Sequence, residues 1–150
     1  MIIEVKDADE MIAFGKRLAD LLRGGEVIEL IGDIGAGKTT LTKGIGEGLG
    51  VTDDVQSPSF TISRVYPIRD GLTLAHYDFY RLDDAGIMKQ ELGETVADLK
   101  TITVIEWGNV VAGVLPSDRL TLSIVPPTEL TRRIIVEAHG PISRRIEHGL

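Results

Sequence analysis

The spacing of apolar residues divides the chain into alternating strands and helices. Met11, Phe14 and Leu18 recur at helical spacing after Asp7, an N-cap candidate, which favours an amphipathic helix. Short apolar runs bounded by turn residues predict strands at 2–5, 26–31, 60–67, 72–80, 102–106, 119–125 and 132–138. Helices are predicted at 8–23, 38–49 and 83–92, with a short helical piece at 95–99 and a frayed helix after Pro141.

This order of elements predicts an α/β fold. Two strand pairs read as hairpins, one turning at Arg69-Asp70-Gly71 and one separated by Pro126-Pro127. We therefore expect a mixed, mostly parallel central sheet flanked by helices, with antiparallel hairpin additions. A length of 150 residues suggests one domain over 1–150, with 141–150 as a flexible C-terminal tail.

Composition excludes several classes of function. The absence of cysteine excludes disulfides and thiol catalysis, and no apolar run reaches the roughly 20 residues that a membrane helix needs. The N-terminus is too acidic for a signal peptide, so a cytoplasmic protein without membrane contact is expected. A net charge of −7 disfavours direct binding to nucleic acid, and the pairs Arg132-Arg133 and Arg144-Arg145 read as ordinary solvated charge.

The segment from Gly32 to Thr39 carries the strongest chemical signal. Gly-Asp-Ile-Gly-Ala-Gly-Lys-Thr matches the phosphate-binding pattern G-x-x-x-x-G-K-[ST] and lies between a predicted strand and a predicted helix. Glycines let successive backbone N–H groups surround a phosphate, and Lys38 adds a positive charge. The Thr39 hydroxyl suits Mg²⁺. Nucleotide contacts are expected from Asp33, Gly35, Ala36, Gly37, Lys38, Thr39 and Thr40.

The helix that follows this loop contains three glycines, at 44, 46 and 48. Each costs about 1 kcal/mol relative to alanine in a helix interior. We therefore expect tertiary packing or a bound ligand to stabilise this helix.

Two acids stand at the ends of predicted strands, where the ligands of open α/β sheets bind. Glu106 closes Ile102–Ile105 and either holds the metal, orients the attacking water or simply leaves a buried strand. Asp78 lies on the same strand face as His76 and Tyr80, and is either a metal or switch contact or a structural hydrogen-bond partner. His76 itself reads as structural.

Three further features lie near these acids in the sequence. Ser57-Pro58-Ser59-Phe60-Thr61 places hydroxyl groups about where GTPases have a switch loop. Ser59 or Thr61 therefore reads the γ-phosphate or completes the Mg²⁺ shell, unless the segment is an ordinary loop. Trp107 either lines the site or packs in the core. Arg81 is either a γ-phosphate sensor or a surface charge.

These motifs, in this order and spacing, resemble the TsaE (YjeE) family of P-loop ATPases. The resemblance covers about residues 5 to 138 and is carried by 32–40, 57–61, His76–Leu82 and Glu106-Trp107. It implies a P-loop fold and slow hydrolysis of ATP with Mg²⁺. It also implies a complex with TsaD and TsaB, which modify tRNA by threonylcarbamoylation of the adenosine next to the anticodon, so that tRNA is met only through the complex.

By motif, the resemblance assigns phosphate and metal binding to Lys38 and Thr39, and catalysis to Lys38, Asp78 and Glu106. It makes Trp107 a neighbour important for activity. It places Ser59 and Thr61 in a switch-like loop, although Ser59 stands where the family usually has threonine.

Two other classes of protein stay open on the residues alone. A small-molecule kinase needs an arginine-bearing lid, and the region after Leu82 is poor in arginine. A GTP-dependent switch needs a guanine-recognition segment of the type Asn-Lys-x-Asp, which the sequence lacks.

Overall fold

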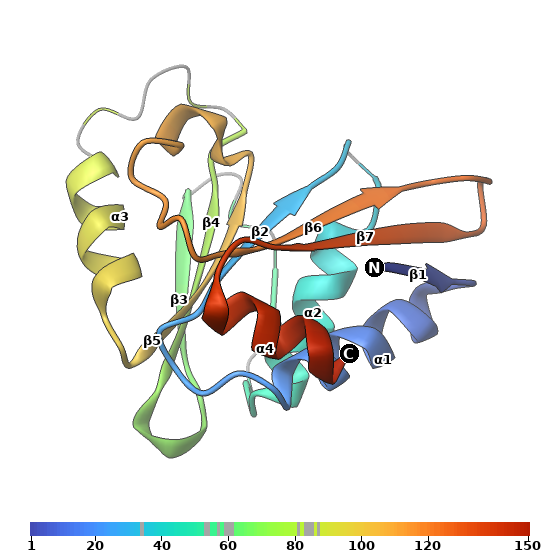
Figure 1. Ribbon diagram of the computed structural model, residues 1–150, viewed down its shortest axis with the longest axis horizontal. Coiled ribbons are helices and arrows are strands. Elements are labelled where there is room, and N and C mark those ends of the chain that lie inside the picture. The colour runs from blue at the N-terminus through green and yellow to red at the C-terminus, as the bar shows by residue number, and fades with distance from the viewer. Residues whose placement is uncertain are drawn as a thin grey trace.

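A mixed sheet of seven strands, in the order β1-β7-β6-β2-β5-β4-β3, forms the centre of the computed structural model (Figure 1). The structure describes residues 1–33, 35–52, 55–56, 58, 62–80, 82, 86 and 88–150. The strands are β1 (Ile2–Val5), β2 (Val27–Ile31), β3 (Ser63–Pro67), β4 (Thr73–Asp78), β5 (Thr101–Glu106), β6 (Leu120–Val125) and β7 (Arg132–Ala138). The predicted α/β class with a mixed sheet is confirmed.

The inner strands β4, β5, β2 and β6 run parallel to one another. The outer pairs β3–β4, β6–β7 and β1–β7 are antiparallel, which confirms both predicted hairpins. At the first turn Asp70 adopts a left-handed conformation with φ of 59°. The carboxyl ends of the parallel strands therefore meet at one edge of the sheet, where ligands of such folds bind.

The helices are α1 (Ala8–Ala19), α2 (Lys38–Gly48), α3 (Met88–Ala97) and α4 (Pro141–Gly149). The Asp7 carboxylate accepts the Glu10 amide proton at 2.9 Å, so the predicted N-cap is confirmed. Helix α1 ends earlier than the predicted residue 23. Its continuation tightens into turns in which the amides of Leu21 and Leu22 donate to carbonyls three residues back.

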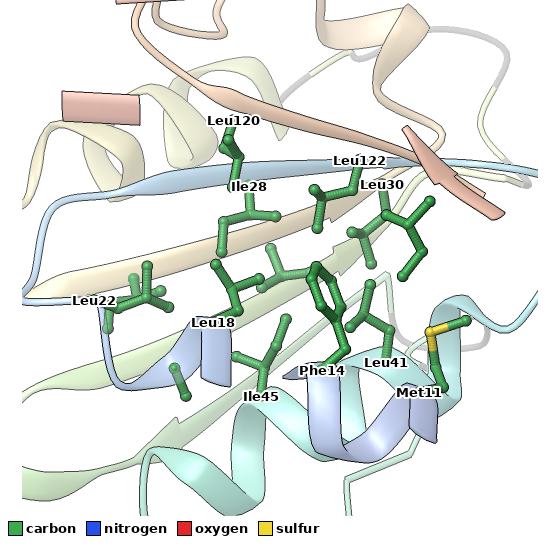
Figure 2. Close-up of a cluster of buried hydrophobic side chains, with 14 of the residues drawn as sticks. Met11, Phe14, Leu18, Leu22, Ile28, Leu30, Leu41, Ile45, Leu120 and Leu122 are labelled. Atoms are coloured by element: carbon green, nitrogen blue, oxygen red, sulfur yellow. The ribbon is translucent and has the colours of Figure 1, made fainter. Parts of the chain in front are cut away.

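Helices α1, α2 and α4 cover one face of the sheet, and α3 lies apart from them on the other face (Figure 1). Figure 2 shows side chains of α1 and α2 pointing at those of β2 and β6. This core includes Met11, Phe14, Leu18, Ile28, Leu30, Leu41, Ile45, Leu120 and Leu122, each no more than 2% exposed. The phosphate loop therefore leads from a buried strand into a helix that packs on the same core.

Close contact between α1 and α2 accounts for the glycines of α2. A Cβ atom on Gly44 would collide with the Ile12 carbonyl oxygen, and one on Gly48 would lie 2.6 Å from the Ala19 Cβ. The expectation that tertiary packing offsets the poor helix propensity of these glycines is borne out, because the two backbones approach too closely for larger residues.

Two predicted helical segments differ from the structure. The pieces expected at 83–92 and 95–99 are one helix, α3, because Leu92 is fully buried against the second face of the sheet and holds the middle of this helix in place. Asp83, the expected cap, lies outside the described residues.

The C-terminal segment is not a flexible tail. Helix α4 buries Ile146 to 1% exposure, and the Arg145 guanidinium donates to the Leu21 carbonyl at 2.8 Å and to Glu26 at 3.2 Å. In the part of the chain that the structure describes, no helix combines the length and apolar character required to cross a bilayer.

Candidate functional site: the phosphate loop and its acidic neighbours

The loop between β2 and α2 has the backbone geometry of an anion-binding nest. Gly35 and Gly37 have φ of 83° and 112°, in the left-handed region that favours glycine. Helix α2 begins at Lys38, and the Gly37 N-cap supplies no side-chain hydrogen bond. The first N–H groups of a helix lack intrahelical partners, so those of Lys38, Thr39 and Thr40 can receive an anion.

The Lys38 side chain is held beneath this loop and is 6% exposed as a residue. Its ammonium donates to the Gly32 carbonyl oxygen at 2.6 Å and lies 3.9 Å from Oε1 of Glu106. It also lies 4.3 Å from the centre of the Trp107 ring, a cation–π distance. The predicted lysine is therefore at the mouth of the loop, among acceptor groups.

Burial lowers the pKa of Lys38 below its ordinary value, because the charged form loses hydration. The carboxylates of Glu106, Asp78 and Asp33 act in the opposite direction and offset part of this shift. An incoming polyphosphate would likewise favour the ammonium form, so the site is poised to gain from binding an anion.

The two predicted acids come together as neighbours on adjacent parallel strands. Asp78 on β4 pairs in register with Glu106 on β5, and they are 5% and 3% exposed. The Tyr80 amide donates to Asp78 at 3.0 Å. Two carboxylates side by side beneath Lys38 form a strongly acidic wall beside the phosphate loop.

His76, which was predicted to be structural, contacts one of the predicted acids. Its Nε2 lies 2.6 Å from Oε2 of Glu106, and the histidine is fully buried. Strand alternation did place His76 and Asp78 on one face, but the cross-strand neighbour that His76 contacts depends on sheet order, which the sequence did not supply.

Trp107 follows Glu106 in a left-handed conformation with φ of 56°. Its ring packs against Tyr80 with centroids 5.0 Å apart and also contacts the second hydrophobic cluster. Trp107 therefore contacts both the second hydrophobic cluster and the Lys38 ammonium, and its role at the site stays a prediction. Lys38, Asp33, Trp107 and Asn109 line a pocket of about 140 Å³.

The remaining predicted residues divide into two groups. Asp33 is exposed and Ala36 is buried, while Thr39 and Thr40 are partly exposed at the first turn of α2. Ser59 and Thr61, with Ser57 and Arg81, lie outside the described residues. Ile62, which follows the predicted switch segment, accepts the Asp78 amide proton through its carbonyl at 2.8 Å.

Arg132 contradicts its interpretation as solvated charge. Its guanidinium donates to the carbonyl oxygens of Ala36 at 3.0 Å and Gly35 at 3.3 Å, across the phosphate loop from Lys38. Arg145 is likewise tied to α1 and Glu26, as described above. Arg133 fits the solvated reading, because it pairs with Glu4 at the surface.

A second pocket, of about 160 Å³, opens beside Arg132. Asp7, Met11, Thr40 and Leu130 line it together with Gly35 and Gly37 of the loop. Sequence reasoning missed this pocket, because its walls come from the start of α1, the phosphate loop and the β6–β7 turn, which meet only in the folded chain.

Residues with oxygen donors suited to a hard cation lie at the first turn of α2 and at the carboxyl ends of β4 and β5. Thr39, Asp78 and Glu106 supply a hydroxyl and two carboxylates. Within the described residues, no group of three or more histidine, aspartate or glutamate side chains is arranged to bind a metal by itself. Mg²⁺ commonly takes one or two carboxylates and completes its shell with phosphate and water, so this donor set fits such a cation on a nucleotide.

Comparison with known proteins identifies the family. The family model described as "Threonylcarbamoyl adenosine biosynthesis protein TsaE" matches residues 5–134. The tRNA threonylcarbamoyladenosine biosynthesis protein TsaE of Streptomyces coelicolor is 47% identical over 115 residues, which cover 76% of this chain and 78% of that protein. The protein of the same name from Bacillus subtilis is 39% identical over 134 residues, or 88% and 82% of the two chains.

A solved structure agrees. The crystal structure of Bacillus subtilis YdiB superposes with a TM-score of 0.77 at 33% identity, over 99% of this chain and 90% of that one. The fold is therefore shared over the whole sheet, including the P-loop and the strands that carry Asp78 and Glu106. The chain belongs to the TsaE family of tRNA threonylcarbamoyladenosine biosynthesis proteins.

Proposed function

We propose that this protein is a cytoplasmic, Mg²⁺-dependent ATPase that supports threonylcarbamoylation of tRNA. The observation that carries the proposal is the position of Lys38, at the first turn of α2 and 3.9 Å from one of two paired strand-end carboxylates. P-loop NTPases bind a nucleotide and its metal with this arrangement, in which a lysine ammonium lies between a nest of backbone N–H groups and acidic side chains.

The loop residues bind and orient the phosphates. The N–H groups of Lys38, Thr39 and Thr40 at the start of α2 would bind the phosphates, and the positive end of the α2 dipole adds to their attraction. The Lys38 ammonium exchanges its bond with the Gly32 carbonyl for the β- and γ-phosphate oxygens. Burial disfavours the charged form of Lys38, and the negative charges of a bound nucleotide would stabilise that form. This attraction contributes to the free energy of nucleotide binding.

The Thr39 hydroxyl, Glu106 and, directly or through water, Asp78 would hold Mg²⁺. When bound, the cation neutralises charge that develops on the phosphate oxygens. Through Oε1, the oxygen on the Lys38 side, Glu106 would either hold the metal or orient the attacking water. That water attacks the γ-phosphorus as the bond to the β-phosphate oxygen breaks, so that ADP and phosphate leave.

The second pocket offers a place for the nucleoside. It adjoins Thr40, the last loop residue expected to contact phosphate, and Met11 and Leu130 provide apolar surface for a base. Arg132 borders the same pocket and donates to the carbonyls of Gly35 and Ala36, which helps to fix the shape of the loop.

The partners in this proposal are TsaB and TsaD, the pair that transfers the threonylcarbamoyl group. The family name places the chain in this pathway, and a net charge of −7 favours contact with tRNA through a complex over direct contact. The ATPase does not perform the transfer. It supports repeated turnover of the pair, and weak activity of the isolated chain is expected because a partner completes the site.

Two measurements test the proposal. Calorimetry with Mg²⁺ should detect ATP binding that is tighter than GTP binding and is lost without the metal. Co-purification with TsaB and TsaD should depend on ATP. If no nucleoside triphosphate binds, either alone or with both partners present, the ATPase proposal is wrong. If ATP binds but neither partner is retained under any nucleotide condition, the proposed role in the complex is wrong.

A further inference from the structure

His76 contacts Glu106, one of the two acids at the strand ends. The ring is fully buried on β4, and its Nε2 meets Oε2 of Glu106 at 2.6 Å. The other oxygen of the same carboxylate, Oε1, faces the Lys38 ammonium. The two oxygens of Glu106 therefore have different partners, one deep in the sheet and one at the mouth of the phosphate loop.

The contact with Glu106 indicates which ring nitrogen of His76 carries a proton. Among the described residues, Nδ1 of His76 has no hydrogen-bond partner, and it is buried. An ionised carboxylate oxygen can only accept a hydrogen bond, so the short contact between Nε2 and Oε2 requires a proton on Nε2. The geometry therefore has Nε2 of His76 donating to Oε2 of Glu106.

This bond restricts the Glu106 side chain. A glutamate has three rotatable side-chain bonds, and two acids in register repel each other, so an unsupported Glu106 would sample several positions next to Asp78. The charged and polar groups that face Glu106 are Lys38 from α2, and Asp78 and His76 from β4. His76 is the donor on the buried side, and its anchor leaves Oε1 turned towards Lys38.

The geometry assigns His76 as a positioning residue that holds the Glu106 carboxylate ready for the nucleotide by donating from Nε2 to Oε2. This inference rests on the proposed ATPase function. It predicts that His76 acts on turnover through Glu106 and has little effect on nucleotide binding, which is assigned to the loop and Lys38. Loss of an outer partner of a metal-site ligand typically costs about 10- to 100-fold.

The test compares two substitutions with a control. His76→Gln places an amide N–H near the position of Nε2, whereas His76→Leu fills space without a donor. His76→Leu should lower kcat about 10- to 100-fold with the KM for ATP within about twofold, and His76→Gln should recover most of the rate. The control is His148→Gln, because His148 is exposed in the last turn of α4.

A second readout needs neither nucleotide nor activity. The ring nitrogen spectrum of ¹⁵N-labelled protein should show His76 with its proton on Nε2, and substitution of Glu106→Gln should shift that signal. A ring without a proton on Nε2 would overturn the inference, as would a wild-type rate in His76→Leu or equal losses of rate in the leucine and glutamine variants that both remain folded. If the wild-type protein binds no ATP, the proposed function fails instead, and the spectrum still decides whether His76 holds Glu106.

Discussion

One short polar contact joins the interior strands β4 and β5, and another joins the outer strands β1 and β7, and the two contacts have different surroundings. His76 and Glu106 meet at 2.6 Å with side chains 0% and 4% exposed. Arg133 and Glu4 meet at 2.7 Å with side chains 44% and 57% exposed. The distances are nearly equal, but water screens the outer pair and is excluded from the inner one.

The difference follows from the positions of the strands. Both faces of β4 and β5 are covered, by α2 with its core on one side and by the cluster around α3 on the other. Strand β1 is at an edge of the sheet. A charged group on an inner strand loses its hydration and needs a partner, so the buried group of Lys38, His76 and Glu106 is a candidate for chemistry. The outer pair is solvated and needs no such explanation.

The largest effect on activity is expected from removal of the Lys38 ammonium. Lys38→Ala should reduce ATP hydrolysis by at least about 100-fold, because a preorganised donor to the phosphate oxygens is lost. The melting temperature should stay close to that of the wild type, since Lys38 does not belong to the hydrophobic core. Near-wild-type hydrolysis by a folded variant would count against the assignment of the loop.

The next largest effect is expected from substitution of Glu106 in the inner contact, with Glu4 of the outer contact as the comparison. Glu106→Gln should lower kcat about 100-fold while ATP affinity changes by a smaller factor, because the carboxylate acts on metal and water more than on the loop. Glu4→Gln is the matched control and should change neither value, and its effect on stability should stay within about 0.5 kcal/mol. Equal losses of binding and turnover in Glu106→Gln would argue against its proposed role.

Arg69 is a half-buried charged residue, intermediate in exposure between the inner and the outer contact. Its guanidinium donates to the carbonyls of Gly48 at 2.9 Å, Ala19 at 3.0 Å and Leu22 at 3.1 Å, so it joins the C-terminal ends of α1 and α2 to the β3–β4 turn. Arg69→Met should lower the free energy of unfolding by about 2–3 kcal/mol, measured by urea denaturation.

Arg64 on the same hairpin is exposed and provides the control. Arg64→Met should change stability by less than about 0.5 kcal/mol. Similar values for the two methionine variants would show that the helix-end bonds of Arg69 contribute little.

The smallest effect concerns Asp118, which accepts from the Ile142 and Ser143 amides and the Ser143 hydroxyl at the start of α4. Partial burial acts to raise the pKa of Asp118, but these hydrogen bonds outweigh it and hold the pKa below its usual 3.8. A lowered pKa in the folded state stabilises the protein above the unfolded-state value, and this contribution is lost as the pH falls through the folded-state value.

Asp118→Ala should therefore lower the free energy of unfolding by about 1 kcal/mol at neutral pH, by analogy with loss of a helix cap. The deficit should shrink as the pH falls below 3.8. Asp118→Asn keeps an acceptor oxygen that does not titrate, so it should retain most of the neutral-pH stability. A deficit in Asp118→Ala that is independent of pH would contradict this account.

Local patterns predicted most of the fold. The phosphate loop, the Asp7 cap and both hairpins depend on residues close together in the sequence, and the structure has all of them. The errors lie where tertiary contacts decide. Leu92 belongs to one continuous helix because it packs on the sheet, and the last helix is ordered because Ile146 joins the core.

The site shows the same division. A motif and the rule that strand ends carry ligands predicted Lys38, Asp78 and Glu106 as site residues, and the register of β4 on β5 places the two acids side by side. The contact of His76 with Glu106 was missed, since β4 and β5 are 30 residues apart at this point and their adjacency comes from the sheet. Arg132 was missed for the same reason, because 96 residues separate it from Ala36.

The sequence by itself determined which residues form the phosphate loop, since backbone dihedrals, helix initiation and a nearby lysine are properties of one short segment. It also determined the class of fold, through the periodicity of its apolar residues. Tertiary structure alone decided which side chains surround that loop and in what state. Burial, hydrogen-bond partners and charge proximity depend on strand order, and strand order depends on the packing of the whole chain.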